Sequence, residues 1–140
     1  MILKIKKLNL EAKVPSYAHP GDAGLDLFAL QEVILKPGEF TRIQTGVAIE
    51  IPTGNVGLIW DKSGMAANFG LKILGGVVDA GYRGEVQVGM INLSQKSYTI
   101  EKHHKVAQML IQKVESPEIK EVDELSDTAR GSGGFGSTGK

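Results

Sequence analysis

The 140-residue sequence contains no cysteine, and this absence excludes disulfide bonds, thiolate catalysis and cysteine-ligated zinc. A net charge is also absent. Because 16 basic and 16 acidic side chains cancel, nothing in the bulk charge points to nucleic acid or a membrane as a partner. No stretch approaches the roughly 18 apolar residues of a membrane-spanning helix, and the start, MILKIKKLNL, has no continuous apolar run. We therefore expect a cytoplasmic protein that binds neither nucleic acid nor a membrane.

The length suits one domain, and its pattern favours β-strands. Short apolar runs recur between glycines and prolines, and residues 42–45 and 85–88 alternate polar and apolar side chains as half-buried strands do. Residues 36–39 (KPGE) predict a type II turn, and residues 52–54 (PTG) predict a similar stop. Only residues 63–69, which a glycine follows, could form a helix. The pattern predicts an all-β sandwich or barrel with one short helix.

The last part of the chain has a different composition. An acidic stretch, residues 118–127, is followed by ARGSGGFGSTGK, residues 129–140. Its glycines indicate either a flexible tail, because glycine loses much entropy on ordering, or an anion-binding arm whose backbone N–H groups surround phosphates. We expect a β domain at residues 1–114 and an arm at residues 115–140.

Two short motifs place polar groups beside glycines. In DAGLDL, Asp26 is either a turn residue before a strand or a functional carboxylate. In DKSG, Lys62 and Ser63 stand at the start of the short helix, where backbone N–H groups can bind anions. The alternative for DKSG is an ordinary serine cap.

Two further motifs lie beside apolar runs. GVVDAGYRGE predicts a strand, a glycine turn and a strand, and the Asp79 carboxylate needs either a polar cleft or partners. The flat face of the Tyr82 ring could stack on a ring of a ligand. The alternative for this motif is a hairpin with a capping aspartate and no ligand. In HHKVAQ, His103 and His104 would point to opposite faces of a strand, so one metal ion could not easily bind both.

Five segments, AGLDL, KSG, GVVDAGYRGE, VAQ and RGSGGFGSTG, resemble in this order the motifs of the homotrimeric dUTP diphosphatases (dUTPases). The resemblance runs from about Asp22 to Thr138. It implies a distorted β jelly-roll (β-clip) subunit in a homotrimer, with each active site between subunits and closed by the flexible arm of a third. It also implies an enzyme that hydrolyses dUTP to dUMP and pyrophosphate, which limits uracil incorporation into DNA and supplies dUMP for dTMP synthesis.

The resemblance implies a role for each matching residue. Asp79 would be the catalytic base that activates water for in-line attack on the α-phosphorus, and Mg²⁺ would bridge the phosphates and contact Asp26 through water. Tyr82 would pack on the deoxyribose and exclude a ribose 2′-hydroxyl. Main-chain groups near Gly76 and Gln87 would bind the uracil edge and leave no space for a thymine methyl. The α- and β-phosphates would be bound by Lys62, Ser63, Gly64 and Gln108, and the arm would bind the γ-phosphate and uracil through Arg130, Phe135, Gly136, Ser137 and Thr138.

The chain departs from the family pattern in three places. Lys62, preceded by Asp61, replaces an arginine that usually follows proline, so a point charge replaces a planar fork. Gly81 stands where a second acid is usual. Residues 103–105 (HHK) replace a Gly-Asp/Glu-Arg turn.

Two other functions of the same fold stay open. A dCTP deaminase needs a carboxylic acid to move protons at the cytosine ring, and Gly89 occupies the place of its glutamate. A nucleotide-sensing regulatory protein would bind dUTP by ordering its arm, and retention of Asp79 argues against a purely non-catalytic role.

Overall fold

A computed structural model of the chain describes residues 1–136, which form short β-strands and one seven-residue helix, α1, at Ser63–Phe69. Gly70 ends the helix in the left-handed region at φ 65°, and its backbone N–H donates to Ala66. Glycine adopts this conformation without steric cost, so it is the usual residue at this place. The predicted all-β fold and its single short helix are confirmed.

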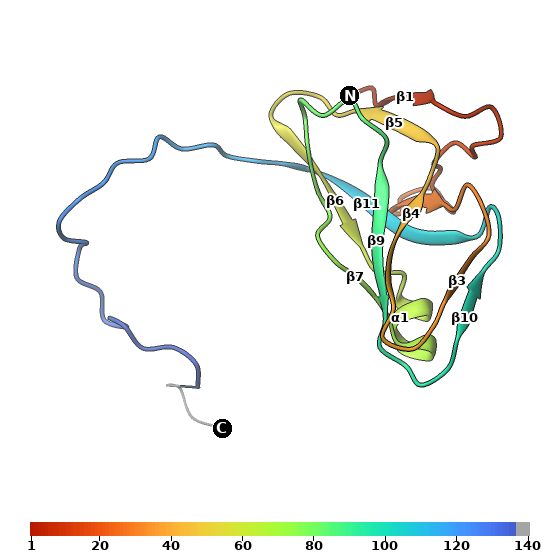
Figure 1. Cartoon of the computed structure of the whole chain (residues 1–140). Helices are drawn as coiled ribbons and strands as arrows, with labels where there is room; N and C mark the ends of the chain where they lie inside the picture. Colours follow the sequence, from red (N-terminus) through yellow and green to blue (C-terminus); the bar gives the residue numbers. More distant parts are fainter. Residues whose placement is uncertain (137–140) are drawn as a thin grey trace.

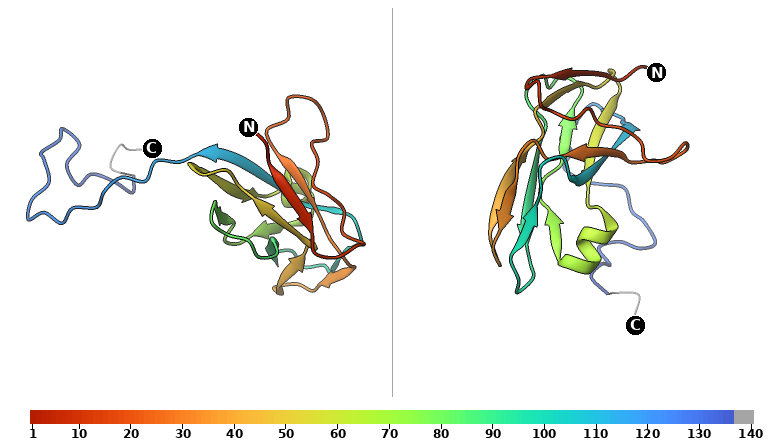
Figure 2. Two further views of the ribbon diagram at one scale, coloured as in Figure 1. Left: turned by 90° about the horizontal axis from the view of Figure 1, so that it is seen from above. Right: turned by 90° about the vertical axis from the view of Figure 1, so that its right-hand side faces the viewer.

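The strands form two larger antiparallel sheets and two small ones (Figures 1 and 2). The four-stranded sheet has the order β2 (Leu25–Phe28), β11 (Lys105–Lys113), β6 (Asn55–Trp60), β8 (Val77–Asp79). The three-stranded sheet has the order β4 (Phe40–Gln44), β9 (Gln87–Asn92), β7 (Leu71–Ile73). The two-stranded sheets pair β1 (Lys4–Lys7) with β5 (Val47–Glu50), and β10 (Tyr98–Ile100) with β3 (Val33–Leu35).

The core holds the inward-facing side chains of these sheets, as the alternation in the sequence predicts. Ile43 and Val88 are fully buried and lie opposite each other on β4 and β9, whereas Arg42, the neighbour of Ile43 on β4, is exposed. The predicted turn at residues 36–39 is present, because the Glu39 N–H donates to the Lys36 carbonyl at 3.0 Å. Burial of such alternating residues from several sheets stabilises the fold mainly through the hydrophobic effect.

The hairpin alternative for GVVDAGYRGE is wrong. The segment that begins at Gly76 does not form a hydrogen-bonded hairpin, because β8 pairs with β6 whereas β9 pairs with β4 and β7. The chain turns at residues 80–86 and passes from one sheet to the other, where the Val86 N–H donates to Val47. A local sequence pattern identifies two strands and a turn, but the partner of each strand is set by long-range packing.

The last residues leave the body of the protein at the end of β11 (Figure 1). Residues 114–136 contain neither helix nor strand and are largely exposed. The division into a domain at residues 1–114 and an arm at residues 115–140 stays a prediction. No helix within residues 1–136 has the length and apolar character needed to cross a membrane.

Candidate active site

The structure brings two of the predicted phosphate-binding residues together at one end of the four-stranded sheet. Ser63, at the start of α1, and Gln108, on β11, line the same hollow beside Trp60. Gln108 donates from Nε2 to the Asp61 carbonyl at 2.8 Å, which fixes its side chain. A side chain at Gly24 would overlap the Gln108 amide oxygen, so the glycine of AGLDL lets this amide take its place.

The start of α1 differs from the expected serine cap. Lys62 occupies the N-cap position in an extended conformation, and no side chain caps the helix. Ser63 is therefore the first helical residue, and Gly64 follows it within the helix. The serine-cap alternative is wrong because the chain bends one residue earlier than the sequence suggested.

Asp26 lies inside β2, not in a turn before it, and is 1% exposed. Its Oδ1 accepts a hydrogen bond from Lys62 Nζ at 2.6 Å, and its Oδ2 accepts one from Lys105 Nζ at 2.7 Å. Burial raises the pKa of the Asp26 carboxyl, but the hydrogen bonds and charges of the two lysines outweigh burial and hold the pKa below its ordinary value. The carboxyl is therefore ionised at neutral pH and paired on both oxygens.

The predicted catalytic base lies at the end of β8 with its side chain exposed. The chain folds back directly after Asp79, since the Tyr82 N–H donates to the Asp79 carbonyl at 3.0 Å. The Tyr82 hydroxyl donates to the Glu85 carbonyl at 3.0 Å, and a side chain at Gly84 would overlap the Tyr82 ring. These contacts orient the ring, which is about half exposed.

Gly76 directly precedes β8, and Gln87 follows the turn that leads from β8 to β9. The Gly76 carbonyl accepts from the Ile59 N–H at 2.8 Å, and the backbone adopts a φ of 108°. A Cβ at Gly76 would lie 2.7 Å from the Ile59 carbonyl oxygen, so both conformation and space require glycine here. Gln87 begins β9, and its side chain donates to Glu85 at 3.0 Å.

The two groups of predicted site residues do not meet within one chain. In the strand register, Gln108 lies opposite Trp60 at the end of β6, whereas Asp79 lies opposite Val56 near its beginning. Directly paired residues share a face of the sheet, so Gln108 and Asp79 project from the same side. Their partners Trp60 and Val56 are four residue steps apart on β6, which amounts to about 13 Å along the strand. This separation is too large for both groups to contact one α-phosphate, as the resemblance to the dUTP diphosphatases implies that they do.

The arm residues lie apart from both groups (Figure 1). Arg130 donates from Nε to the Gly133 carbonyl at 2.8 Å within the arm. The Phe135 side chain is fully exposed, and Phe135 and Gly136 both adopt positive φ angles. The predicted contacts of Ser137 and Thr138 lie outside the described residues.

Two site-adjacent residues were not identified from the sequence as functional. Trp60 is 53% exposed beside the hollow of Ser63 and Gln108, and Lys105 contacts Asp26. The only signal in the sequence was the replacement of the usual Gly-Asp/Glu-Arg turn by residues 103–105. This replacement includes Lys105, but it does not reveal the contact with Asp26. The two histidines precede β11 instead of lying in it, because His103 adopts a φ of 65° and its Nε2 lies 2.8 Å from the Glu11 carbonyl.

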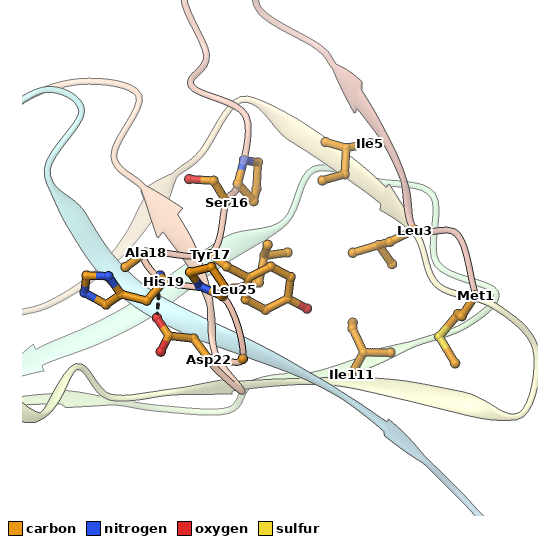
Figure 3. Close-up of a pocket in the computed structure, with 13 residues that line it drawn as sticks. Met1, Leu3, Ile5, Ser16, Tyr17, Ala18, His19, Asp22, Leu25 and Ile111 are labelled. Atoms are coloured by element: carbon orange, nitrogen blue, oxygen red, sulfur yellow. Dashed lines mark hydrogen bonds between the residues drawn. The ribbon is translucent and has the colours of Figure 1, made fainter.

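A larger hollow of about 870 Å³ lies elsewhere, between β1, the loop at residues 15–22 and β11 (Figure 3). In Figure 3 the Tyr17 ring points into this space toward Leu3 and Ile111, and the His19 ring points away from it. Asp22 accepts a hydrogen bond from the His19 N–H at 2.9 Å at its edge. None of the predicted site residues lines it.

Comparison with known proteins gives one consistent result. A family model described as dUTPase matches residues 10–139. The deoxyuridine 5′-triphosphate nucleotidohydrolase of Clostridium kluyveri is 51% identical over 99% of both chains, and that of Nautilia profundicola is 49% identical over the full length of both.

Among solved structures, a Staphylococcus bacteriophage 80alpha dUTPase mutant with dUpNHpp superposes with a TM-score of 0.93 at 34% identity over 99% of both chains. A mutant dUTPase from phage phi11 of S. aureus, whose structure details the coordination of a structural Mg(II) ion, superposes with a TM-score of 0.83 at 31% identity over 89% of this chain and 98% of that one.

Proposed function

The chain belongs to the dUTPase family, and from that premise we propose how its residues act on the nucleotide. The protein is an enzyme that hydrolyses dUTP to dUMP and pyrophosphate. The observation that carries the proposed mechanism is the placement of Gln108 and Asp79 on one face of one sheet.

Asp79 is the catalytic base in this proposal. Its exposed carboxylate accepts a proton from a water molecule, which then attacks the α-phosphorus in line with the leaving pyrophosphate. Ser63, the Gly64 amide, Gln108 and Lys62 bind the α- and β-phosphates, where hydrogen-bond donors stabilise the charge that develops on the oxygens. Arg130 pairs with the γ-phosphate through its planar fork, and Phe135 covers the uracil ring.

The active site is completed by neighbouring subunits of a homotrimer. Asp79 of one subunit and Gln108 of another would meet when the outer faces of their four-stranded sheets come together, which removes the separation of about 13 Å within one chain. The face between the two groups supports this arrangement because it is apolar. Val77 is 69% exposed, and Leu58 and Leu110 are only partly buried, so a second copy would cover them.

The donor set fits a magnesium ion that arrives with the nucleotide. Among residues 1–136 no three histidine or carboxylate side chains gather closely enough to hold a metal ion by themselves. Both oxygens of Asp26 already accept lysine N–H groups, so Asp26 would reach the ion through water, and Mg²⁺ commonly keeps several waters. When bound, the ion would neutralise charge on the phosphates.

Selectivity for deoxyuridine comes from the turn between β8 and β9. Main-chain groups near Gly76 and Gln87 would imitate the pairing edge of adenine and leave no space for a thymine methyl. The need for glycine at position 76, where a Cβ would lie 2.7 Å from the Ile59 carbonyl oxygen, supports a close approach of the main chain there. The braced Tyr82 ring packs on the deoxyribose, so a ribose 2′-hydroxyl would clash with it. The dCTP deaminase alternative is disfavoured further, because a Cβ at Gly89 would lie 2.8 Å from the Leu74 carbonyl oxygen and a glutamate has no space there.

The proposed selectivity is tested by chromatographic product analysis with dUTP, dCTP, dTTP and UTP, each incubated with the protein and Mg²⁺. We expect dUMP and pyrophosphate from dUTP, with rates for dTTP and UTP at least about a hundred-fold lower because both are excluded sterically. Hydrolysis of UTP at a similar rate would refute the role of Tyr82. Conversion of dCTP to a uracil nucleotide would establish the deaminase instead.

A further inference from the structure

One buried cluster beside the active site contains a charge that the mechanism above does not use. Asp26 is almost completely buried, and both of its oxygens accept lysine N–H groups, from Lys62 at 2.6 Å and from Lys105 at 2.7 Å. One carboxylate and two ammonium groups leave a net charge of +1. Exposed ion pairs are common and contribute little, but a buried carboxylate with two cationic partners is an arrangement that the fold has to build.

The fold builds it from three separate segments. Asp26 lies on β2 opposite Gln108, and Lys62 precedes α1. Lys105 is three residues before Gln108, so in a regular strand it would project from the opposite face. The pairing of β11 with β2 is irregular between Lys105 and Ala107, and Lys105 lies opposite Phe28, two residues from Asp26. This bulge turns Lys105 to the same face as Asp26 and Gln108, and such bulges commonly redirect a side chain.

Both lysines also remain accessible to a ligand. The Lys62 side chain is 28% exposed and the Lys105 side chain 46%, although Asp26 between them is buried. An ammonium group has three N–H donors, and the contact with Asp26 uses one of them on each lysine. Two cationic groups with free donors are therefore held by Asp26, which lies opposite Gln108 in the register of β2 and β11.

From this geometry we infer that Lys105 is a second phosphate-binding lysine, which contacts the β,γ end of the nucleotide together with Lys62. Asp26 acts as a positioning residue that holds the two ammonium groups side by side. A lysine side chain is flexible, and a fixed carboxylate removes much of the entropy that binding would otherwise cost. The inference rests on the proposed function, since it assigns the ligand of the cluster as the triphosphate of the same site.

The pair also accounts for the replacement of an arginine by Lys62. Arginine presents five donors in a rigid fork and can bind two phosphate oxygens at once, whereas one lysine is a single point charge. Two lysines fixed by one carboxylate restore a two-point contact. In this inference, the two lysines held by Asp26 make the two contacts with phosphate oxygens that one arginine usually makes.

The test compares Lys105→Met with two other variants, using inorganic pyrophosphate as the probe. Lys105→Arg keeps the charge, and Lys102→Met removes a nearby lysine that pairs with Glu11 on the surface. Affinity for pyrophosphate in the presence of Mg²⁺ is measured by calorimetry, and KM and kcat for dUTP are measured in parallel. We expect Lys105→Met to weaken pyrophosphate binding and raise KM by about ten- to a hundred-fold, the usual effect of losing a hydrogen bond to a charged group. Lys105→Arg should recover most of this loss, and Lys102→Met should change either quantity by less than about two-fold.

Other results would overturn the inference. If Lys105→Met lowers the melting temperature but leaves pyrophosphate affinity and KM unchanged, Lys105 only neutralises Asp26. An equal loss in Lys102→Met would mean that bulk positive charge is responsible. If Lys105→Met does not fold, Lys105→Gln replaces it, because glutamine can still donate to Asp26 without a charge. Failure of the unaltered protein to hydrolyse dUTP would refute the proposed function, whereas the pyrophosphate comparison would still decide the role of Lys105.

Discussion

Replacing Asp79 with asparagine is expected to lower kcat for dUTP by about two to four orders of magnitude, the range typical for loss of a general base. The exchange keeps the size of the side chain and removes the group that accepts the proton. Because Asp79 lies at an exposed strand end, the fold should be unaffected. Steady-state kinetics with detection of pyrophosphate measures the loss, and calorimetry with dUpNHpp measures binding.

If Asp79 is the general base, Asp79→Asn must lower turnover and leave the affinity for the nucleotide nearly unchanged. We expect the affinity of Asp79→Asn for dUpNHpp to stay within about ten-fold of the unaltered protein, because the base acts on water and not on the nucleotide. Asp22→Asn is the matched control, since Asp22 bonds only to the His19 backbone among its described partners. If Asp79→Asn kept normal turnover, the base would be another residue. Normal binding with no turnover in the unaltered protein as well would favour a nucleotide-sensing protein.

Removing residues 129–140 is expected to abolish detectable turnover and to leave the trimer intact. The deletion takes away Arg130 and Phe135, the charged and aromatic contacts proposed for the γ-phosphate and uracil. Residues 114–136 add neither helix nor strand to the body of the protein, so the core should keep its stability. The measurements are kcat/KM for dUTP, the melting temperature and the molar mass by sedimentation.

A single exchange in the acidic part of the arm, Glu121→Gln, provides the control for this deletion, because no role is assigned to it. Phe135→Ala should give an intermediate effect, mainly on KM, since it removes one face of the uracil site and leaves the phosphate contacts. Full activity in the truncated protein would show that the arm takes no part in the reaction. Loss of the trimer on truncation would assign the arm to assembly.

Local features of the fold could be predicted from the sequence. Proline and glycine identified the turn at residues 36–39, and the glycine after Phe69 identified the end of α1, because both depend on backbone conformation within a few residues. Partners across the fold could not be predicted in this way. The segments around Val78 and Val88 looked like one hairpin, yet they belong to two sheets.

The same limit applies to the site. Asp26 looked like a turn residue, and its burial between two lysines depends on segments far apart in the sequence. The side of β11 on which Lys105 projects is reversed by a bulge that alternation alone does not reveal. The resemblance implied an active site between subunits, but the order of the motifs did not reveal that Asp79 and Gln108 pair with residues near opposite ends of β6, the observation that supports the proposed shared site.

The shared active site is tested most directly by mixing two inactive variants. Asp79→Asn keeps Ser63, and Ser63→Ala keeps Asp79. If each site takes these residues from different subunits, random reassembly of an equal mixture places both intact residues in about a quarter of the sites. We therefore predict recovery of about a quarter of the dUTP hydrolysis rate of the unaltered protein, with mixed trimers verified by native mass spectrometry. Activity no higher than that of the separate variants, in the presence of mixed trimers, would contradict a site shared between subunits.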